Sequence, residues 1–180
     1  MLDRRVALLR GINVGTAKRI AMADLRELFE ELGYREVRTL LNSGNVVFSI
    51  ARRSDGDTAG RIERAITDRT GVTTRVIVLT GKEVAAAVRG NPLGRVADDP
   101  SRLLVMVPRE PSAVARLKPL LTQGWSPEAL ALGKRVAYLW CAGGSIDSRL
   151  LAAVNRVLGD RGTTRNLATM TKLVALVGMS

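Results

Sequence analysis

The chain contains no histidine among its 180 residues and only one cysteine, Cys141. Histidine is the commonest general base near neutral pH and a standard zinc ligand, so its absence excludes Ser-His-Asp and Cys-His catalysis and the usual zinc sites. A single cysteine excludes an internal disulfide and fits a reducing compartment. We therefore expect a cytoplasmic protein with no metal and no cofactor.

Aromatic residues and long apolar runs are also scarce. Aromatics make up 3% of the chain, so a core must be built from Leu, Val, Ile and Ala. The longest apolar runs, such as residues 103–107, are a third or less of the ~20 residues that a membrane helix needs. The N-terminus also lacks the apolar segment and cleavage site of a signal peptide. The composition predicts a globular protein without a membrane partner.

Acidic residues are outnumbered by basic ones, 17 against 28, which gives a net charge of +11. The imbalance is uneven, because residues 101–180 hold 11 basic and 4 acidic side chains. A positive field of this size favours anionic partners, and nucleic acid is the obvious one. The alternative is a compositional habit, since 23 of the basic residues are arginine, with the charge solvated at the surface. Charge alone leaves both interpretations open.

Apolar periodicity predicts a β-α-β-β-α-β order in the first half of the chain. The expected elements are a strand at 6–9, a helix at 22–32, strands at 36–41 and 46–50, a helix ending at Gly71, and a strand at 75–79. Glycines at 33 and 71 stand where left-handed caps would end the two helices. This order is that of the ferredoxin-like unit.

The second half repeats the order less completely. After a helix to residue 88 and a connector at 91–100, we expect a strand at 103–107, a helix from 112 disturbed by Pro119, hairpin strands at 129–132 and 135–141, and helices at 147–158 and 167–177. A helix stands where the sixth element would be a strand. The sequence thus predicts an α+β fold with two ferredoxin-like halves, 1–91 and 92–180, the second imperfect and followed by an extra C-terminal helix.

Three loops are richer in Gly, Asn, Thr or Arg than simple turns require. They are Arg10-Gly11-Ile12-Asn13-Val14-Gly15, Asn42-Ser43-Gly44-Asn45 and Thr163-Thr164-Arg165-Asn166. A glycine-rich loop before a helix exposes N–H groups that can gather an anion, and the arginine fork suits phosphate or carboxylate. The candidate ligand-binding residues are Arg10, Gly11, Asn13, Gly15, Lys18, Asn45, Arg165, Asn166 and Lys172, and none is a candidate catalytic residue.

Each loop also has a purely structural interpretation. The first loop is also explained as a long crossover in which Asn13 satisfies backbone groups. Asn45 is explained as tight hairpin chemistry, which we favour there. In the third segment, Thr163, Thr164 or Asn166 could cap the following helix with Arg165 solvated, but the segment is more polar than one cap requires, so we favour a binding role there. The glycine spacing matches neither a dinucleotide fingerprint nor a phosphate loop, so the phosphate signal is weak.

Four motifs occur in a characteristic order: Arg10–Gly15, Met22-Ala23-Asp24-Leu25-Arg26, residues 42–48, and Thr164-Arg165-Asn166 followed by Thr171-Lys172-Leu173. In this the chain resembles the bacterial domain-of-unknown-function family sixteen-ninety-seven (DUF1697) over essentially its whole length. The resemblance implies a small cytoplasmic α+β protein of ferredoxin-like construction, without a settled activity. Thr16 and Leu167-Ala168 depart from the family pattern, which usually has a second Gly and Trp-Asn there.

Three hypotheses about function follow. The favoured one is a binding module for a phosphate-bearing ligand, either nucleic acid or a nucleotide. The second is a small enzyme that relies on a lysine of lowered pKa, Lys18 or Lys172, although no nucleophile–base pair stands out. The third is an interaction protein that self-associates through its sheets, as a homodimer.

Overall fold

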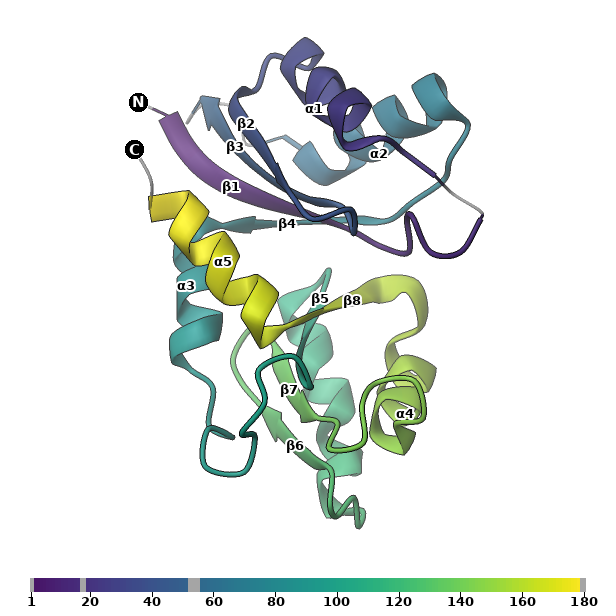
Figure 1. Ribbon diagram of the computed structural model, residues 1–180, viewed down its shortest axis with the longest axis vertical. Helices are drawn as coiled ribbons and strands as arrows, with labels where there is room; N and C mark the ends of the chain where they lie inside the picture. Colours follow the sequence, from purple (N-terminus) through teal and green to yellow (C-terminus); the bar gives the residue numbers. More distant parts are fainter. Residues whose placement is uncertain (1, 17–18, 52–55, 179–180) are drawn as a thin grey trace. The chain divides into compact units, whose positions relative to one another are not determined.

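The chain divides into two units, each with its own sheet and helices (Figure 1). The computed structural model describes residues 2–16, 19–51 and 56–178. The N-terminal unit comprises the residues up to Lys82 together with the end of the last helix from Ala175, and the C-terminal unit comprises Glu83–Val174.

The N-terminal unit has the predicted β-α-β-β-α-β order. Its elements are β1 (Leu2–Leu9), α1 (Met22–Glu31), β2 (Arg35–Leu40), β3 (Asn45–Ala51), α2 (Thr58–Thr70) and β4 (Val76–Thr80). The strands form an antiparallel sheet in the order β2-β3-β1-β4, and α1 and α2 cover one of its faces (Figure 1). Gly33 and Gly71 have φ angles of 88° and 69°, so both predicted helix ends are confirmed.

An aromatic cluster fills the space between α1 and the sheet of this unit. The Phe48 ring lies 5.2 Å from that of Phe29 and 4.8 Å from that of Tyr34, and both phenylalanines are completely buried. Alternate residues of β1 and β3 pack on the same cluster, as period-two patterning requires. The few aromatic residues of the chain are thus concentrated in its cores.

The C-terminal unit repeats this order in full. After α3 (Gly81–Arg89) come β5 (Leu103–Pro108), the 3₁₀-helix η1 (Pro111–Thr122), β6 (Ala129–Leu132), β7 (Ala137–Trp140), α4 (Arg149–Leu158), the short η2 (Gly159–Arg161), β8 (Gly162–Asn166) and α5 (Leu167–Gly178). The antiparallel strand order β6-β7-β5-β8 corresponds to that of the first sheet. The fold is therefore α+β with two ferredoxin-like halves and a C-terminal helix.

Strand β8 corrects one detail of the expected order. The segment 163–166 had the composition of a loop, but it pairs with β5, with Arg165 opposite Val105 and Thr163 opposite Val107. Main-chain hydrogen bonds can hold an edge strand in a sheet even when its side chains do not alternate between apolar and polar. Threonine is β-branched and therefore suits a strand. The sixth element of the second half is therefore a strand, with α5 added after it.

Helix η1 is the real imperfection of the second half. Pro119 lies inside it and Pro111 at its start, and a proline within a helix removes a backbone donor and clashes with the preceding turn. The segment consequently winds as a 3₁₀-helix where the first half has the α-helix α1.

In the described part of the chain, no helix is both long enough and apolar enough to cross a bilayer.

Candidate functional site

The first polar loop joins the end of β1 to the start of α1. Gly11, Asn13 and Gly15 alternate along it with φ angles of 61°, 53° and 65°. This left-handed region is open to glycine and is tolerated by asparagine better than by most other residues. The glycine spacing that marked the loop is thus explained by three left-handed turns of the backbone.

Asn13 closes the loop with its side-chain amide. Its Nδ2 donates to the carbonyls of Ile20, at 2.9 Å, and Asn42, at 2.7 Å, while its Oδ1 accepts from the Ile20 N–H at 2.8 Å. One side chain therefore joins the start of the loop, its end and the β2–β3 turn. Asn13 therefore satisfies backbone groups, as the structural interpretation of this loop predicts, and it holds Ile20 and Asn42 in place.

An opening of about 380 Å³ lies beside this closure, and we call it the loop opening. Its lining residues are Asn13, Arg19, Ile20, Ala21, Met22 and Asn42. Ala21 is the N-cap of α1 and provides no side-chain acceptor, so within the described residues no side chain caps the first N–H groups of the helix. Arg19 is exposed and donates from Nη2 to the Gly15 carbonyl at 2.9 Å, which holds the guanidinium near the loop. A cation and uncapped helix donors thus border one opening.

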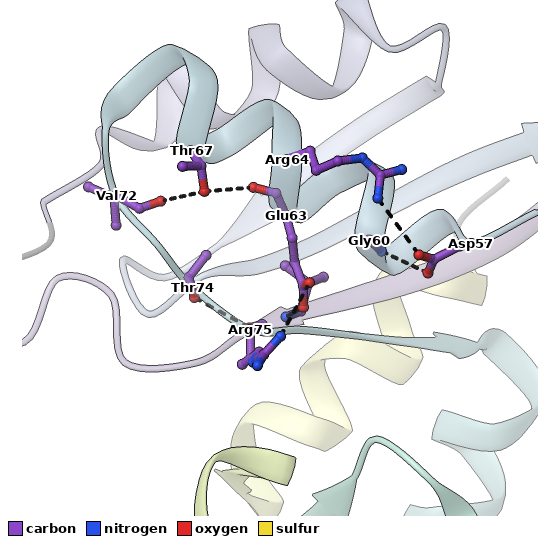
Figure 2. A network of polar contacts seen from close by, with 9 residues as sticks. Asp57, Gly60, Glu63, Arg64, Thr67, Val72, Thr74 and Arg75 are labelled. Carbon is purple, nitrogen blue, oxygen red and sulfur yellow. Dashed lines mark hydrogen bonds and ion pairs between the residues drawn. The ribbon is translucent and has the colours of Figure 1, made fainter.

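The base of the loop is tied to the segment before β4. Arg10 donates its N–H to the Arg75 carbonyl at 2.9 Å, and its own carbonyl accepts from Thr74 Oγ1 at 2.7 Å. That segment is held in turn by Glu63 of α2, which accepts from the Val76 N–H at 2.8 Å and lies 4.0 Å from the Arg75 guanidinium (Figure 2). These contacts fix the base of the loop, at the end of β1, against the segment before β4.

The second polar loop is a tight turn between β2 and β3. Asn45 is completely buried, and its Nδ2 donates to the Leu40 carbonyl and to Ser43 Oγ, both at 2.9 Å. Gly44 has a φ of 80°, and a Cβ there would lie 2.8 Å from side-chain atoms of Leu9 and Ile12. The hairpin interpretation favoured for this loop is confirmed.

The third polar segment belongs to the C-terminal unit. Arg165 on β8 is 9% exposed, and its Nη1 donates to Thr163 Oγ1 at 3.0 Å and to the Thr164 carbonyl at 2.9 Å. Burial lowers the pKa of its guanidinium to about 10. Asn166 Oδ1 accepts from the Thr169 N–H at 2.8 Å, so Asn166 caps α5, and Lys172 is exposed two turns along that helix.

The predicted site residues therefore fall into two groups. Arg10, Gly11, Asn13, Gly15 and Asn45 lie together in the N-terminal unit, around the first loop and the β2–β3 turn. Arg165, Asn166 and Lys172 lie in the C-terminal unit, and Lys18 lies outside the described residues. Sequence reasoning did not anticipate the roles of Ala21 and Asn42. The predicted helix start at residue 22 already placed an alanine before the helix, but that Ala21 and Asn42 line one opening depends on contacts between distant parts of the chain.

Comparison with known proteins gives a family and a fold. The pattern of the family described as "Protein of unknown function (DUF1697)" matches residues 2–138. The conserved bacterial protein SP0830 from Streptococcus pneumoniae has a similar structure, with a TM-score of 0.75 at 21% sequence identity. The match covers 98% of this chain and 99% of that protein. Among curated proteins, none is detectably similar to this chain.

Proposed function

Since the chain belongs to the DUF1697 family, whose description assigns no activity, we propose a function from its own residues: it binds a phosphate-bearing ligand, a nucleotide or nucleic acid, with a phosphate group at the loop opening. The observation that carries this proposal is the pairing of Arg19 with the uncapped start of α1 across one opening. Helix N-termini attract anions because their N–H groups and dipole point outward.

The charges around the opening favour an anion. Among the described residues, Arg19 has no carboxylate partner, and its one hydrogen bond leaves other guanidinium N–H groups for a ligand. Asp24 in the first turn of α1 is acidic and exposed, but it is not part of the lining. The opening has the size of small-molecule sites, for which about 300–1,000 Å³ is usual.

The residues predicted from the sequence enter the proposal with different roles. Gly11, Asn13 and Gly15 shape the loop, and Arg10 anchors its base. Lys18 follows the left-handed turn at Gly15 in the sequence and stays a predicted ligand contact. Arg165, Asn166 and Lys172 stay predicted as a second group, of which Lys172 is the exposed cation.

Substitution at Ala21 tests the proposal most sharply. Ala21→Asp places an N-cap carboxylate on the same N–H groups that the phosphate would use. A side-chain cap stabilises a helix by about 1 kcal/mol relative to alanine. The proposal therefore predicts a more stable protein that binds inorganic phosphate and ADP more weakly, as measured by urea unfolding and by isothermal titration calorimetry.

Arg19→Glu should remove phosphate binding without affecting the fold. Arg26→Glu is the matched control, because Arg26 is an exposed arginine that pairs with Glu30 on α1 and causes the same change in net charge. Equal loss of binding in both variants would show a general effect of charge. Unchanged phosphate binding in Ala21→Asp and Arg19→Glu would reject the loop opening as the site.

A further inference from the structure

The two helices that cover the sheet of the C-terminal unit, η1 and α4, carry charged side chains of one sign. Helices η1 and α4 contact each other and bury the apolar residues Leu117, Leu120, Leu150 and Val154. Their exposed sides carry Arg116 and Lys118 on η1 and Arg149 and Arg156 on α4, and we call these four residues the basic helix face. Neither helix contains an acidic residue.

The four cations are unpaired within the described part of the chain. None of them forms an ion pair or a side-chain hydrogen bond there, and the nearest acidic residues in sequence, Glu110, Asp147 and Asp160, lie outside the two helices. Arginines of the N-terminal unit are placed differently, since Arg69 contacts Glu27 at 2.8 Å and Glu31 at 2.6 Å. Exposed cations without an ion pair also occur elsewhere among the described residues, Arg19 among them, but here two contacting helices carry four such cations and no acidic side chain.

The two ends of α4 treat their cations differently. Arg149 is the first residue of α4, where the helix dipole disfavours a cation, and the Glu128 carboxylate accepts from the Leu150 N–H at 3.2 Å at this same end. Arg156 lies in the last turn, where the dipole favours a cation. The two arginines are seven residues apart, so they lie on one side of the helix about 10 Å from each other. This separation exceeds the Debye length of about 8 Å at physiological ionic strength, so each arginine can contact an anionic group separately.

We propose that the basic helix face docks the phosphate backbone of a nucleic acid duplex. Three of its four cations are arginines, whose planar fork matches phosphate oxygens. Small residues, Ala115 and Ala152, stand exposed on the same helices, and no aromatic side chain is present there for stacking on unpaired bases. Because the protein would contact only the phosphate backbone of the duplex, its binding should be independent of base sequence and strongly dependent on salt concentration.

This surface shares no residue with the loop opening, so the two proposals fail or succeed separately. Reversing Arg149 and Arg156 should leave the binding of inorganic phosphate at the loop opening unchanged. Arg19→Glu, in turn, should leave the contribution of the basic helix face to duplex binding intact.

The test is the salt dependence of duplex binding by the full chain, measured by fluorescence anisotropy with a short mixed-sequence DNA duplex. The variant Arg149→Glu/Arg156→Glu should bind at least ~10-fold more weakly, and the slope of log K against log salt should fall by about 2, since two phosphate contacts are lost. Arg26→Glu/Arg64→Glu is the matched control, with the same net charge and with exposed arginines that pair with carboxylates.

Three results would overturn the proposal. One is an equal loss of affinity and slope in the control pair, which would make the effect a property of net charge. Another is undiminished duplex binding by the reversed pair. The third is binding of a polyglutamate chain as tightly as the duplex at near-physiological salt, which would assign the surface to an acidic protein. Should the reversed pair fail to fold, Arg149→Gln/Arg156→Gln gives the same test with charges removed.

Discussion

Two helix layers of the same topology carry very different charges in this chain. Helices α1 and α2 together hold six acidic and four basic side chains, whereas η1 and α4 hold four basic ones and no acidic one. Their inner sides are alike, with buried leucine, valine or isoleucine at helical spacing on both. The fold therefore requires the apolar inner sides and leaves the charge of the outer sides free for another purpose.

Ion pairs within and between α1 and α2 neutralise part of the charge on the first layer. Arg69 of α2 reaches two glutamates of α1, Glu27 and Glu31, so the two helices are joined across their outer edges. Arg26 pairs with Glu30 one turn along its own helix. The second layer has no such contacts among the described residues, and this difference is what separates a solvated surface from a candidate docking surface.

The largest effects should appear where the two halves are alike, in their cores. Phe48→Ala should lower the free energy of unfolding by about 3–5 kcal/mol, because the ring contacts Phe29 and Tyr34 and is fully buried. Leu139→Ala, on the corresponding inner strand β7, should cost about 2–5 kcal/mol. Urea unfolding measures both, and a cost below about 1 kcal/mol in either half would contradict equivalent cores.

The polar loops should differ more between the halves. Asn13→Ala should cost about 2–3 kcal/mol, because it leaves backbone groups of Ile20 and Asn42 without partners and places alanine at a left-handed φ. Asn13→Gly keeps the backbone conformation and isolates the lost hydrogen bonds. Asn166→Ala, which removes only the α5 cap, should cost about 1 kcal/mol. Equal costs at positions 13 and 166 would contradict the closing role of Asn13.

Much of the fold could be predicted from the sequence because apolar periodicity and left-handed glycines act locally. Strand β1, helix α1 and the stops at Gly33 and Gly71 are of this kind. Strand β8 could not be predicted in the same way. Its polar residues are held by main-chain pairing with β5, which depends on a partner far away in the sequence.

The candidate site could be predicted only in part. The glycine loop and Asn13 could be singled out from the sequence. The hydrogen bonds of the three asparagines, however, show structural roles: Asn13 closes the loop, Asn45 holds a turn and Asn166 caps α5. The excess of basic residues in the second half could be read from the sequence, but the four unpaired cations of the basic helix face could not. Whether an arginine is neutralised depends on neighbours such as the Glu27–Arg69 pair, which are distant along the chain.

Removing single surface arginines should have small and different effects in the two layers. Arg69→Ala should lower the midpoint of urea unfolding slightly, because it breaks two exposed ion pairs between α1 and α2. Arg156→Ala should change the midpoint less, since Arg156 has no ion pair among the described residues and makes only the weak favourable interaction of a cation in the last turn of α4. Raising the salt concentration should reduce the difference between these variants. A larger loss in Arg156→Ala than in Arg69→Ala would contradict the comparison.

The smallest expected effect is a pH dependence in the N-terminal unit. The hydrogen bond from Ser49 Oγ, at 2.5 Å, and then the nearby Arg4 lower the pKa of Glu36 below its ordinary value of 4.5. Its contribution to stability is therefore complete above pH 4.5 and is lost as the pH falls through the lower folded-state pKa. Urea unfolding of the wild type and Glu36→Gln should show a stability difference that shrinks over this range. A difference independent of pH would contradict the assignment.

The most direct test of the account is to map both ligands on the full chain by amide chemical shifts. Titration with ADP should shift residues 19–22 and Asn42, which border the loop opening, whereas a DNA duplex should shift Arg116, Lys118 and residues 149–156. That result would place two anion-binding surfaces on the two halves. Duplex-induced shifts centred on the charge-balanced outer side of α1 and α2, or spread evenly over all arginines, would contradict the account.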